Sequence, residues 1–428
     1  MAGPLRQAPN DPSVHSKCLM AWEIRYTHTM VLSQPIGATI GVSTNAEAEQ
    51  AGCEAAESAL SQLAPRSPKF AVAFGSSWFE QSALLAGIHS ALGEVPLVGE
   101  STAGEIIPSG PTSHSCVVVL LDADSLTCGV GLGEDVDQQP REAGQRAAYM
   151  AVQEFHGAQR SGFLLFGDGL ITNYAEVVRG LQEVLGTNSL IVGGMAGDDL
   201  RFGQTYQYHQ DRVVSRAVVG ALLGGSIKMG VGIEHGFTPI SKPRRVTRAR
   251  ANVIMELDTQ PAASVYEEYF GPDLVKRMRQ EGLTRQGIAY PLGVQSELAD
   301  HWLLRNVVSF GDDGSLLCTG EVLQDSWLQL MIGSRELAME AAQKAARQAV
   351  RSLNRVAIVL IFDSVVRRKF LGPHHAALEI ARIREAIGTA TPLAGCYTYG
   401  EQAPLSAVGT YENTATQTGS VLAVAIGS

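Results

Sequence analysis

The sequence predicts an α/β protein in which repeated strand–helix–strand units form buried sheets flanked by helices, in a two-domain arrangement. The first observation is a set of three continuous apolar runs, which fit strands that are buried on both faces. The second is that each run leads into a helix-like segment and then into another apolar strand. The third is that a glycine-rich loop closes each unit. The three apolar runs cover residues 70–75, 162–167 and 357–362.

A helix is expected after each apolar run because the next segment has helical character and stops at a glycine. Glycine is preferred just past a helix, where the backbone turns left-handed. The helices are expected over residues 81–92, 175–185 and 376–387, followed by Gly93, Gly186 and Gly388.

Two of the glycine loops are similar although they lie far apart in the chain. "PLVGESTAGE" covers residues 96–105, "PLAGCYTYGE" covers residues 392–401, and the two agree at six of ten positions. About one such match arises by chance among all pairs of windows in a chain of this length. The order of the surrounding elements is the stronger evidence, because an alanine-rich helix precedes and an apolar strand follows each loop, including a third at residues 190–199. We therefore expect three α/β units, with Asp198 standing where the other loops have Glu105 and Glu401.

The segment between the second and third units has a different texture. Residues 246–257 alternate like a strand, residues 261–270 and 273–281 have helical character, and a hairpin is expected around residues 311–314. Residues 1–35 have no firm pattern, which predicts a flexible tail. The expected organisation is a tail over 1–35, an N-terminal domain of two units over 36–240, and a C-terminal domain over 241–428.

Composition excludes several classes of protein. The net charge of −10 gives no support to a nucleic-acid surface. The six cysteines form no CxxC motif and several lie in apolar runs, so they are expected to be reduced core residues. No stretch reaches eighteen apolar residues and no signal-peptide pattern opens the chain. We expect a cytoplasmic protein without membrane insertion.

The glycine loops are the candidate ligand site. Ligands of open α/β sheets bind beyond the carboxyl ends of the strands, where glycines let backbone N–H groups approach an anion. The carboxylates of Glu105, Asp198, Asp199 and Glu401 would suit an ammonium group, so that the loops together could hold an amino acid. The alternative is that the glycines form tight turns and the acids cap them. An enzyme acting in the same cleft is a second alternative, although the sequence contains no phosphate-loop, HExxH or GxSxG motif.

Several ordered motifs resemble the FIST family, whose members are sensory proteins with an N-terminal and a C-terminal FIST domain. The resemblance covers about residues 38 to 405. Its anchors are the stretches at residues 98–106, 193–199, 235–239, 246–266 and 395–404. The resemblance implies a small-ligand sensor, for amino acids among others, or alternatively a haem-containing nitric oxide sensor. Because the FIST-like region fills the chain, we expect the signal to pass to a separate protein such as a kinase or a chemotaxis component.

The candidate ligand-binding residues come from these motifs. No catalytic residue, metal ligand or cofactor is expected, and His235 is the best axial ligand if haem is bound. Where family members often carry a cysteine, this chain has residues 362–368, in which Arg367 is a possible anion contact. The full set is Gly99, Ser101, Thr102, Glu105, Gly194, Met195, Asp198, Asp199, His235, Arg367, Tyr397, Thr398 and Glu401.

Overall fold

A computed structural model describes residues 3, 36–171, 173–281, 288–295, 302–405 and 414–428. It confirms the fold class, since several sheets are flanked by helices. The predicted tail over 1–35 lies almost entirely outside the described residues. None of the helices in the described ranges combines the length and the hydrophobicity needed to cross a bilayer.

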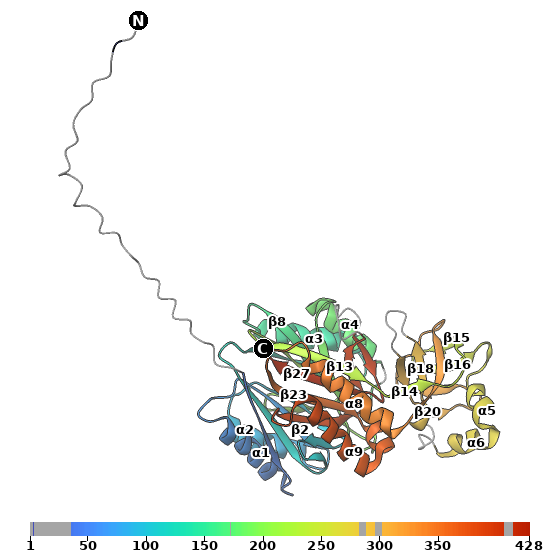
Figure 1. The fold of residues 1–428 in the computed structure, drawn as a ribbon, viewed down its shortest axis with the longest axis horizontal. Coiled ribbons are helices and arrows are strands. Elements are labelled where there is room, and N and C mark those ends of the chain that lie inside the picture. The colour runs from blue at the N-terminus through green and yellow to red at the C-terminus, as the bar shows by residue number, and fades with distance from the viewer. Residues whose placement is uncertain (1–2, 4–35, 172, 282–287, 296–301, 406–413) are drawn as a thin grey trace, which may run out of the picture. The chain divides into compact units, whose positions relative to one another are not determined.

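Three six-stranded sheets share one plan (Figure 1). Each takes four strands from one stretch of chain, of which one neighbouring pair is parallel, and a two-stranded hairpin from another stretch. The first sheet contains β1 (Gly37–Ser43), β2 (Phe70–Ser76), β3 (Leu97–Thr102) and β6 (Cys116–Asp122) with the hairpin β10 (Gln207–His209) and β11 (Arg212–Val214). The second contains β7 (Thr127–Glu134), β8 (Arg160–Gly167), β9 (Ile191–Met195) and β12 (Ala217–Gly224) with β25 (Glu401–Pro404) and β26 (Thr414–Gln417). The third contains β13 (Lys228–Glu234), β23 (Val356–Ser364), β24 (Leu393–Thr398) and β27 (Val421–Gly427) with β4 (Glu105–Ile107) and β5 (Gly110–Thr112).

The hairpins are exchanged in a cycle. The hairpin that follows β3 pairs with β24, the one that follows β24 pairs with β9, and the one that follows β9 pairs with β3. Each sheet is therefore completed by the next stretch of chain in the cycle. The strands before Gly99, Gly193 and Gly395 are buried, as expected. That the three units superimpose, and that they arose by duplication, stay predictions.

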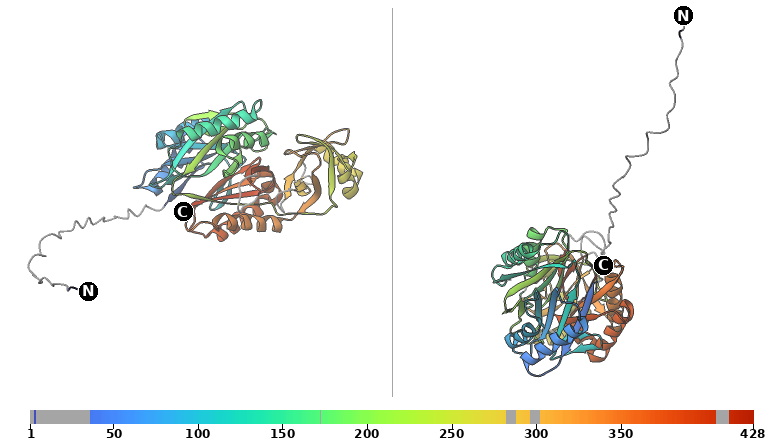
Figure 2. Two further views of the ribbon diagram at one scale, coloured as in Figure 1. Left: turned by 90° about the horizontal axis from the view of Figure 1, so that it is seen from above. Right: turned by 90° about the vertical axis from the view of Figure 1, so that its left-hand side faces the viewer.

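Two helices pack on the outer face of each sheet (Figure 2). Gly93, Gly186 and Gly388 cap three of them with φ values of 66°, 96° and 89°, as the sequence predicts. The helix expected over 376–387 begins earlier than predicted and is kinked at Gly372, directly before Pro373. The helices are α1 (Ala48–Leu63), α2 (Gln81–Leu92), α3 (Pro140–Glu154), α4 (Tyr174–Leu185), α8 (Arg335–Val350) and α9 (Val365–Ile387).

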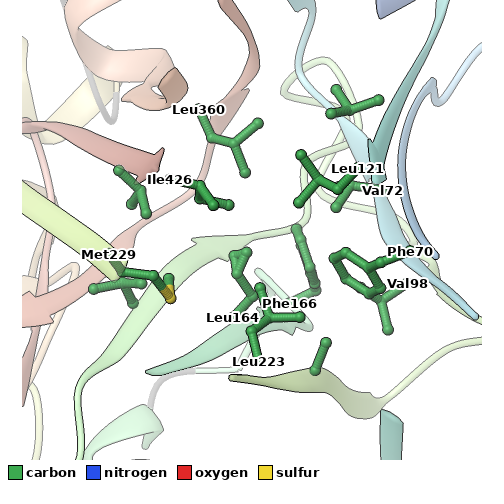
Figure 3. Close-up of a cluster of buried hydrophobic side chains, with 14 of the residues drawn as sticks. Phe70, Val72, Val98, Leu121, Leu164, Phe166, Leu223, Met229, Leu360 and Ile426 are labelled. Carbon is green, nitrogen blue, oxygen red and sulfur yellow. The ribbon is translucent and has the colours of Figure 1, made fainter. Parts of the chain in front are cut away.

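The inner faces of the three sheets meet in one hydrophobic core (Figure 3). Side chains alternate along each strand, so Phe70, Val72 and Phe74 point into this core while the alanines between them pack under α1 and α2. Phe74, Phe166 and Phe362, one from each sheet, have ring centroids 6.0–6.2 Å apart. This aromatic triangle lies where the three sheets come together.

An insertion separates β13 from α8 and has a core of its own. Two sequence expectations need correction there: residues 246–257 form two strands that turn at Ala251, and the strand expected up to Phe310 breaks at Asn306. The hairpin around Gly311–Gly314 is confirmed. Its elements are β14 (Phe237–Pro239), β15 (Arg244–Arg250), β16 (Val253–Leu257), β17 (Gln260–Pro261), α5 (Ser264–Phe270), α6 (Pro272–Glu281), β18 (Leu292–Gln295), β19 (Trp302–Arg305), β20 (Val307–Phe310), β21 (Leu316–Cys318) and β22 (Trp327–Gly333).

Candidate functional site

The shared core becomes polar at the carboxyl ends of the parallel strand pairs. Ser76 and Ser364 lie two residues beyond Phe74 and Phe362, and therefore on the same face of their strands. Asp168 holds the corresponding position after Phe166. All three residues are buried. The predicted ligand residues on the first and third loops lie in or beside this polar layer.

Glu105, the first residue of β4, is completely buried and both of its carboxyl oxygens are bonded. Oε1 accepts a hydrogen bond from Thr102 Oγ1 at 2.5 Å, and Oε2 accepts from Ser115 Oγ at 2.5 Å and Ser115 N at 3.3 Å. Thr102 ends β3 and Ser115 directly precedes β6. The carboxyl group therefore ties together the two ends of the β4–β5 hairpin.

Glu401 repeats this arrangement in β25. Its Oε1 accepts from Thr398 Oγ1 at 2.8 Å, and its Oε2 accepts from Ser420 Oγ at 2.7 Å and Ser420 N at 3.4 Å. Thr398 ends β24 and Ser420 directly precedes β27. The shared contacts support the capping alternative for both acids, because protein groups already satisfy the oxygens that a ligand would use.

Burial sets the charge of both acids. It raises the pKa of Glu105 to about 7 and that of Glu401 to about 8, and the serine and threonine hydroxyls oppose the rise only in part. Both groups therefore change protonation state close to neutral pH. A carboxyl that is neutral in the interior avoids most of the cost of burying a charge.

The second unit differs from the other two. The expectation that Asp198 takes the place of Glu105 and Glu401 is wrong. Glu105 pairs with Cys396, which in turn pairs with the core residue Phe362, and Glu401 pairs with Gly194, which pairs with Phe166. In the remaining hairpin the same position belongs to Gln207, which pairs with Glu100, the partner of Phe74. The reason is loop length: eleven residues, 196–206, lie between β9 and β10, against two in each of the other loops.

Asp168 supplies the missing acid from the end of β8. Its Oδ1 accepts from Thr205 Oγ1 and Leu170 N, both at 2.8 Å, and its Oδ2 accepts from Arg216 N at 3.1 Å. Thr205 precedes β10 and Arg216 precedes β12. An acid thus again links the approach to a hairpin with the strand after it, and sequence analysis missed this residue.

Asp198 organises the long second loop. Its carboxylate accepts from the backbone N–H groups of Phe202, Gly203 and Gln204 at 2.7–3.1 Å and from the Tyr399 hydroxyl. Burial favours the neutral acid, but these donors together hold the pKa of Asp198 below its usual range. Residues 199 and 201–204 of this loop are exposed, whereas Gly104 and Gly400 of the other loops are buried.

Asp199 lies on the exposed side of the same loop. Its Oδ2 accepts from Ser77 Oγ at 2.9 Å, and Arg201 Nη2 donates to the carbonyl and hydroxyl of Ser77. Asp199, Leu200 and Phe202 all have positive φ values, and Phe202 is 59% exposed. The loop therefore holds an acid, a guanidinium and an aromatic ring in strained backbone at the carboxyl end of β2.

Glu100 is a buried acid that sequence analysis did not select. One carboxyl oxygen accepts from Cys396 Sγ at 3.5 Å, and no residue in the described ranges bonds the other. Burial raises the pKa of Glu100 well above its usual range. The signal was present in the sequence, since Glu100 stands within a strand that was expected to be buried.

Arg367 is completely buried, and protein groups already accept its hydrogen bonds. Nε donates to Asp363 at 2.8 Å, Nη1 to the carbonyl of His235 at 2.8 Å, and Nη2 to the carbonyl of Ala338 and to Glu379. Burial and then repulsion by Glu379 raise the pKa of Asp363 well above its usual range. The predicted anion contact is therefore occupied from within the protein, and Asp363 and Glu379 were missed.

The other predicted residues are tied into the fold. Ser101 Oγ donates to Gly197 O and accepts from Tyr206 N, both at 2.9 Å. Tyr397 lies under the Arg368 guanidinium, 4.8 Å from its ring centroid. His235 Nδ1 accepts from Phe237 N at 2.9 Å. Gly99 and Gly194 lie so close to neighbouring groups that no side chain fits: an added Cβ would meet Ala73 O at 2.0 Å and Thr398 Cγ2 at 2.6 Å, respectively. Met195 packs in the core beneath α3 and α4.

A surface hollow of about 640 Å³ lies between α1 and α2, and its lining includes none of the predicted ligand residues. In the part of the chain that the structure describes, no group of three or more His, Cys, Asp or Glu side chains is arranged to hold a metal ion.

Comparison with known protein families matches most of the chain to two domains. Residues 69–260 match the FIST N domain, and residues 262–404 match the FIST C domain. The chain belongs to the FIST family. FIST domains are in general sensory domains of signal transduction. The resemblance found in the sequence is thereby confirmed.

The similar proteins give no activity to transfer. An uncharacterised protein of Mycobacterium tuberculosis is 25% identical over 401 residues, which cover 86% of this chain and 94% of the relative. An uncharacterised protein of Methanocaldococcus jannaschii is 28% identical over 180 residues, and the match covers 40% of this chain and only 34% of that relative. Among solved structures, a cyanuric acid hydrolase from A. caulinodans shares 10% identity, with 91% of this chain and 99% of that chain covered, at a TM-score of 0.38.

Proposed function

We propose that this FIST protein is a cytoplasmic sensor that binds an amino acid or a similar small metabolite and passes the signal to a separate partner protein. The proposal rests on the sensory character of FIST domains and on the matches that cover most of the chain. The buried acids of the polar layer are a further support for the proposal.

The observation that carries the proposal is the group of acids buried where the three sheets meet. Glu100, Glu105 and Glu401 are completely buried at the polar end of the shared hydrophobic core. Burying ionisable groups costs stability, and strongly perturbed groups cluster at functional sites more often than elsewhere. A ligand that alters the loops around this layer would also alter the ionisation of these acids.

The second loop is the entry that we favour among the three. Asp199 and Arg201 present opposite charges on its exposed side, next to the ring of Phe202. An acid and a guanidinium together match the ammonium and carboxylate groups of a zwitterion. Both side chains are anchored to Ser77, so binding would pull on the end of β2.

The test is a thermal-shift screen of the full chain against amino acids and organic acids. A ligand at a hundred times its Kd stabilises the folded state by roughly 2.7 kcal/mol. For an amine-bearing hit, Asp199→Asn should weaken binding, and Asp211→Asn, at an exposed turn of the β10–β11 hairpin, should leave it unchanged. A flat response across the library would reject the sensor, and steady conversion of a bound compound would identify an enzyme instead.

A further inference from the structure

Arg305 is a buried cation whose surroundings differ from those of Arg367. It ends β19, and among the described residues its side chain donates hydrogen bonds to backbone carbonyls: Nε donates to Glu321 O at 2.8 Å, and Nη1 donates to Leu304 O at 2.9 Å and Thr416 O at 3.3 Å. The residue is 5% exposed. Burial lowers the pKa of Arg305 to about 10, so the guanidinium is still charged at neutral pH.

No carboxylate of the described residues lies within ion-pair distance of this guanidinium. The Glu321 side chain, which is close in sequence, is within 3.6 Å of Arg179 on α4 instead. Arg367, by contrast, contacts two buried carboxyl groups. A buried charge without an opposite charge is costly, and anion binding would remove much of that cost. Within the described ranges, Nη2 of Arg305 also has no hydrogen-bond acceptor.

Other buried polar atoms near Arg305 lack partners as well. Both side-chain atoms of Asn306, which is 1% exposed, have no hydrogen-bond partner among the described residues. The same holds for Thr416 Oγ1 and for both amide atoms of Gln402, which stands opposite Thr416 in the β25–β26 ladder. Buried side chains of this kind are normally satisfied by protein, water or a ligand.

We propose that Arg305, Asn306 and the Thr416–Gln402 pair bind the carboxylate of a small organic acid between the insertion and the β25–β26 hairpin. The inference goes beyond the proposed function, because it adds a second site that is separate from Asp199 and Arg201 of the second loop. Because Nε and Nη1 already donate to protein carbonyls, the guanidinium would meet the carboxylate through Nη2, and its single positive charge suits a monoanion better than phosphate. The Asn306 and Gln402 amides accept as well as donate, so they also suit an amino or hydroxyl group next to the carboxylate.

The position connects this site to the polar layer. An added Cβ at Gly419 would lie 3.6 Å from Asn306 Nδ2, and Gly419 N donates to Ser364 Oγ at 3.0 Å. The next residue, Ser420, donates to Glu401. A ligand that orders Asn306 would therefore act on Gly419, the residue directly before the Ser420 that bonds Glu401.

The experiment measures binding of defined probes to the full chain by calorimetry and thermal shift. The carboxylate probes are acetate, lactate and glycine, and their controls are acetamide, glycinamide and inorganic phosphate. At least one carboxylate should bind and none of the controls should match it. Arg305→Gln should weaken that binding by about 30-fold or more, as expected for loss of a buried charge partner. Arg248→Gln, which removes an exposed arginine of the same insertion, should leave it unchanged.

Three results would overturn the inference. These are binding to Arg305→Gln at wild-type affinity, phosphate binding that replaces carboxylate binding, and no binding of any carboxylate to the wild type. In the last case an amine or a neutral metabolite found by the wider screen would leave the proposed function standing. If Arg305→Gln does not fold, Asn306→Ala and Thr416→Val serve instead, and each should weaken carboxylate binding at least about threefold.

Discussion

Replacing Glu401 with glutamine should change how the stability of the protein depends on pH. The pKa of Glu401 is raised from 4.5 to about 8 in the folded state. The folded state therefore binds this proton more tightly than the unfolded state does. The resulting stabilisation is fully present below pH 4.5 and is lost as the pH rises through 8.

The structure sets an upper limit on the effect. At 1.36 kcal/mol for each pH unit, the rise from 4.5 to about 8 corresponds to roughly 4–5 kcal/mol of unfolding free energy. Water entering the site on ionisation would reduce this figure. Glutamine cannot ionise, so Glu401→Gln should lack this loss. It should cost about 1 kcal/mol at pH 5, where only the hydrogen bonds to Thr398 and Ser420 are altered, and should be more stable than the wild type at pH 8.5.

Urea unfolding followed by circular dichroism at pH 5, 6.5 and 8.5 measures the effect. Glu105→Gln should behave in the same way over a narrower range, because the pKa of Glu105 is raised only to about 7. Glu47→Gln is the control, since this glutamate makes no side-chain cap on α1. A difference between Glu401→Gln and wild type that stays constant from pH 5 to pH 8.5 would refute the reasoning.

Three further predictions concern single positions. Gly104→Val should lower the unfolding free energy by about 2 kcal/mol or more, because φ is 115° there and an added Cβ would meet Arg368 Nη1 at 1.8 Å; Gly400→Val, at a residue without positive φ, should cost less, and equal losses in denaturant titrations would contradict this. Arg367→Met should cost about 3–5 kcal/mol, since it leaves Asp363 and Glu379 buried without their cation, and unfolding at wild-type denaturant concentration would show that the network contributes nothing. Reconstitution with haem should give no shift of the Soret band, because His235 Nδ1 accepts a backbone hydrogen bond and the proton of the neutral ring is therefore on Nε2, where it blocks binding to iron; a shift that disappears in His235→Ala would establish the haem alternative.

Local sequence patterns predicted many helices and strands, but they could not predict which strands pair across long distances in the chain. Gly93, Gly186 and Gly388 marked three helix ends because a left-handed cap has a strong preference for glycine. The exchange of hairpins between sheets could not be predicted, since β4, β10 and β25 look like short continuations of their own loops. Asp198 was aligned with Glu105 because motif spacing cannot show that one loop is nine residues longer.

The positions of four candidate residues in the fold were predicted from the sequence, but their contacts were not. Thr102, Glu105, Thr398 and Glu401 do lie at the carboxyl ends of buried strands. Their serine partners could not be found from the sequence, because Ser115 and Ser420 are ordinary polar residues until the fold brings them to the acids. Arg305 carried no signal at all, since an arginine in a strand is normally exposed.

The cyclic exchange of hairpins has a consequence for how the chain can be divided. A fragment that ended near residue 240 would contain β7, β8, β9 and β12 but not β25 and β26, so the edge of β9 would be open to water and to other chains. The same fragment would keep β4 and β5 with no β24 to receive them. The first sheet can be completed once β11 has been made, because its six strands all lie within residues 37–214, whereas the second sheet needs β26 (Thr414–Gln417) and the third needs β27 (Val421–Gly427). Each sheet therefore depends on a hairpin that another stretch of the chain supplies.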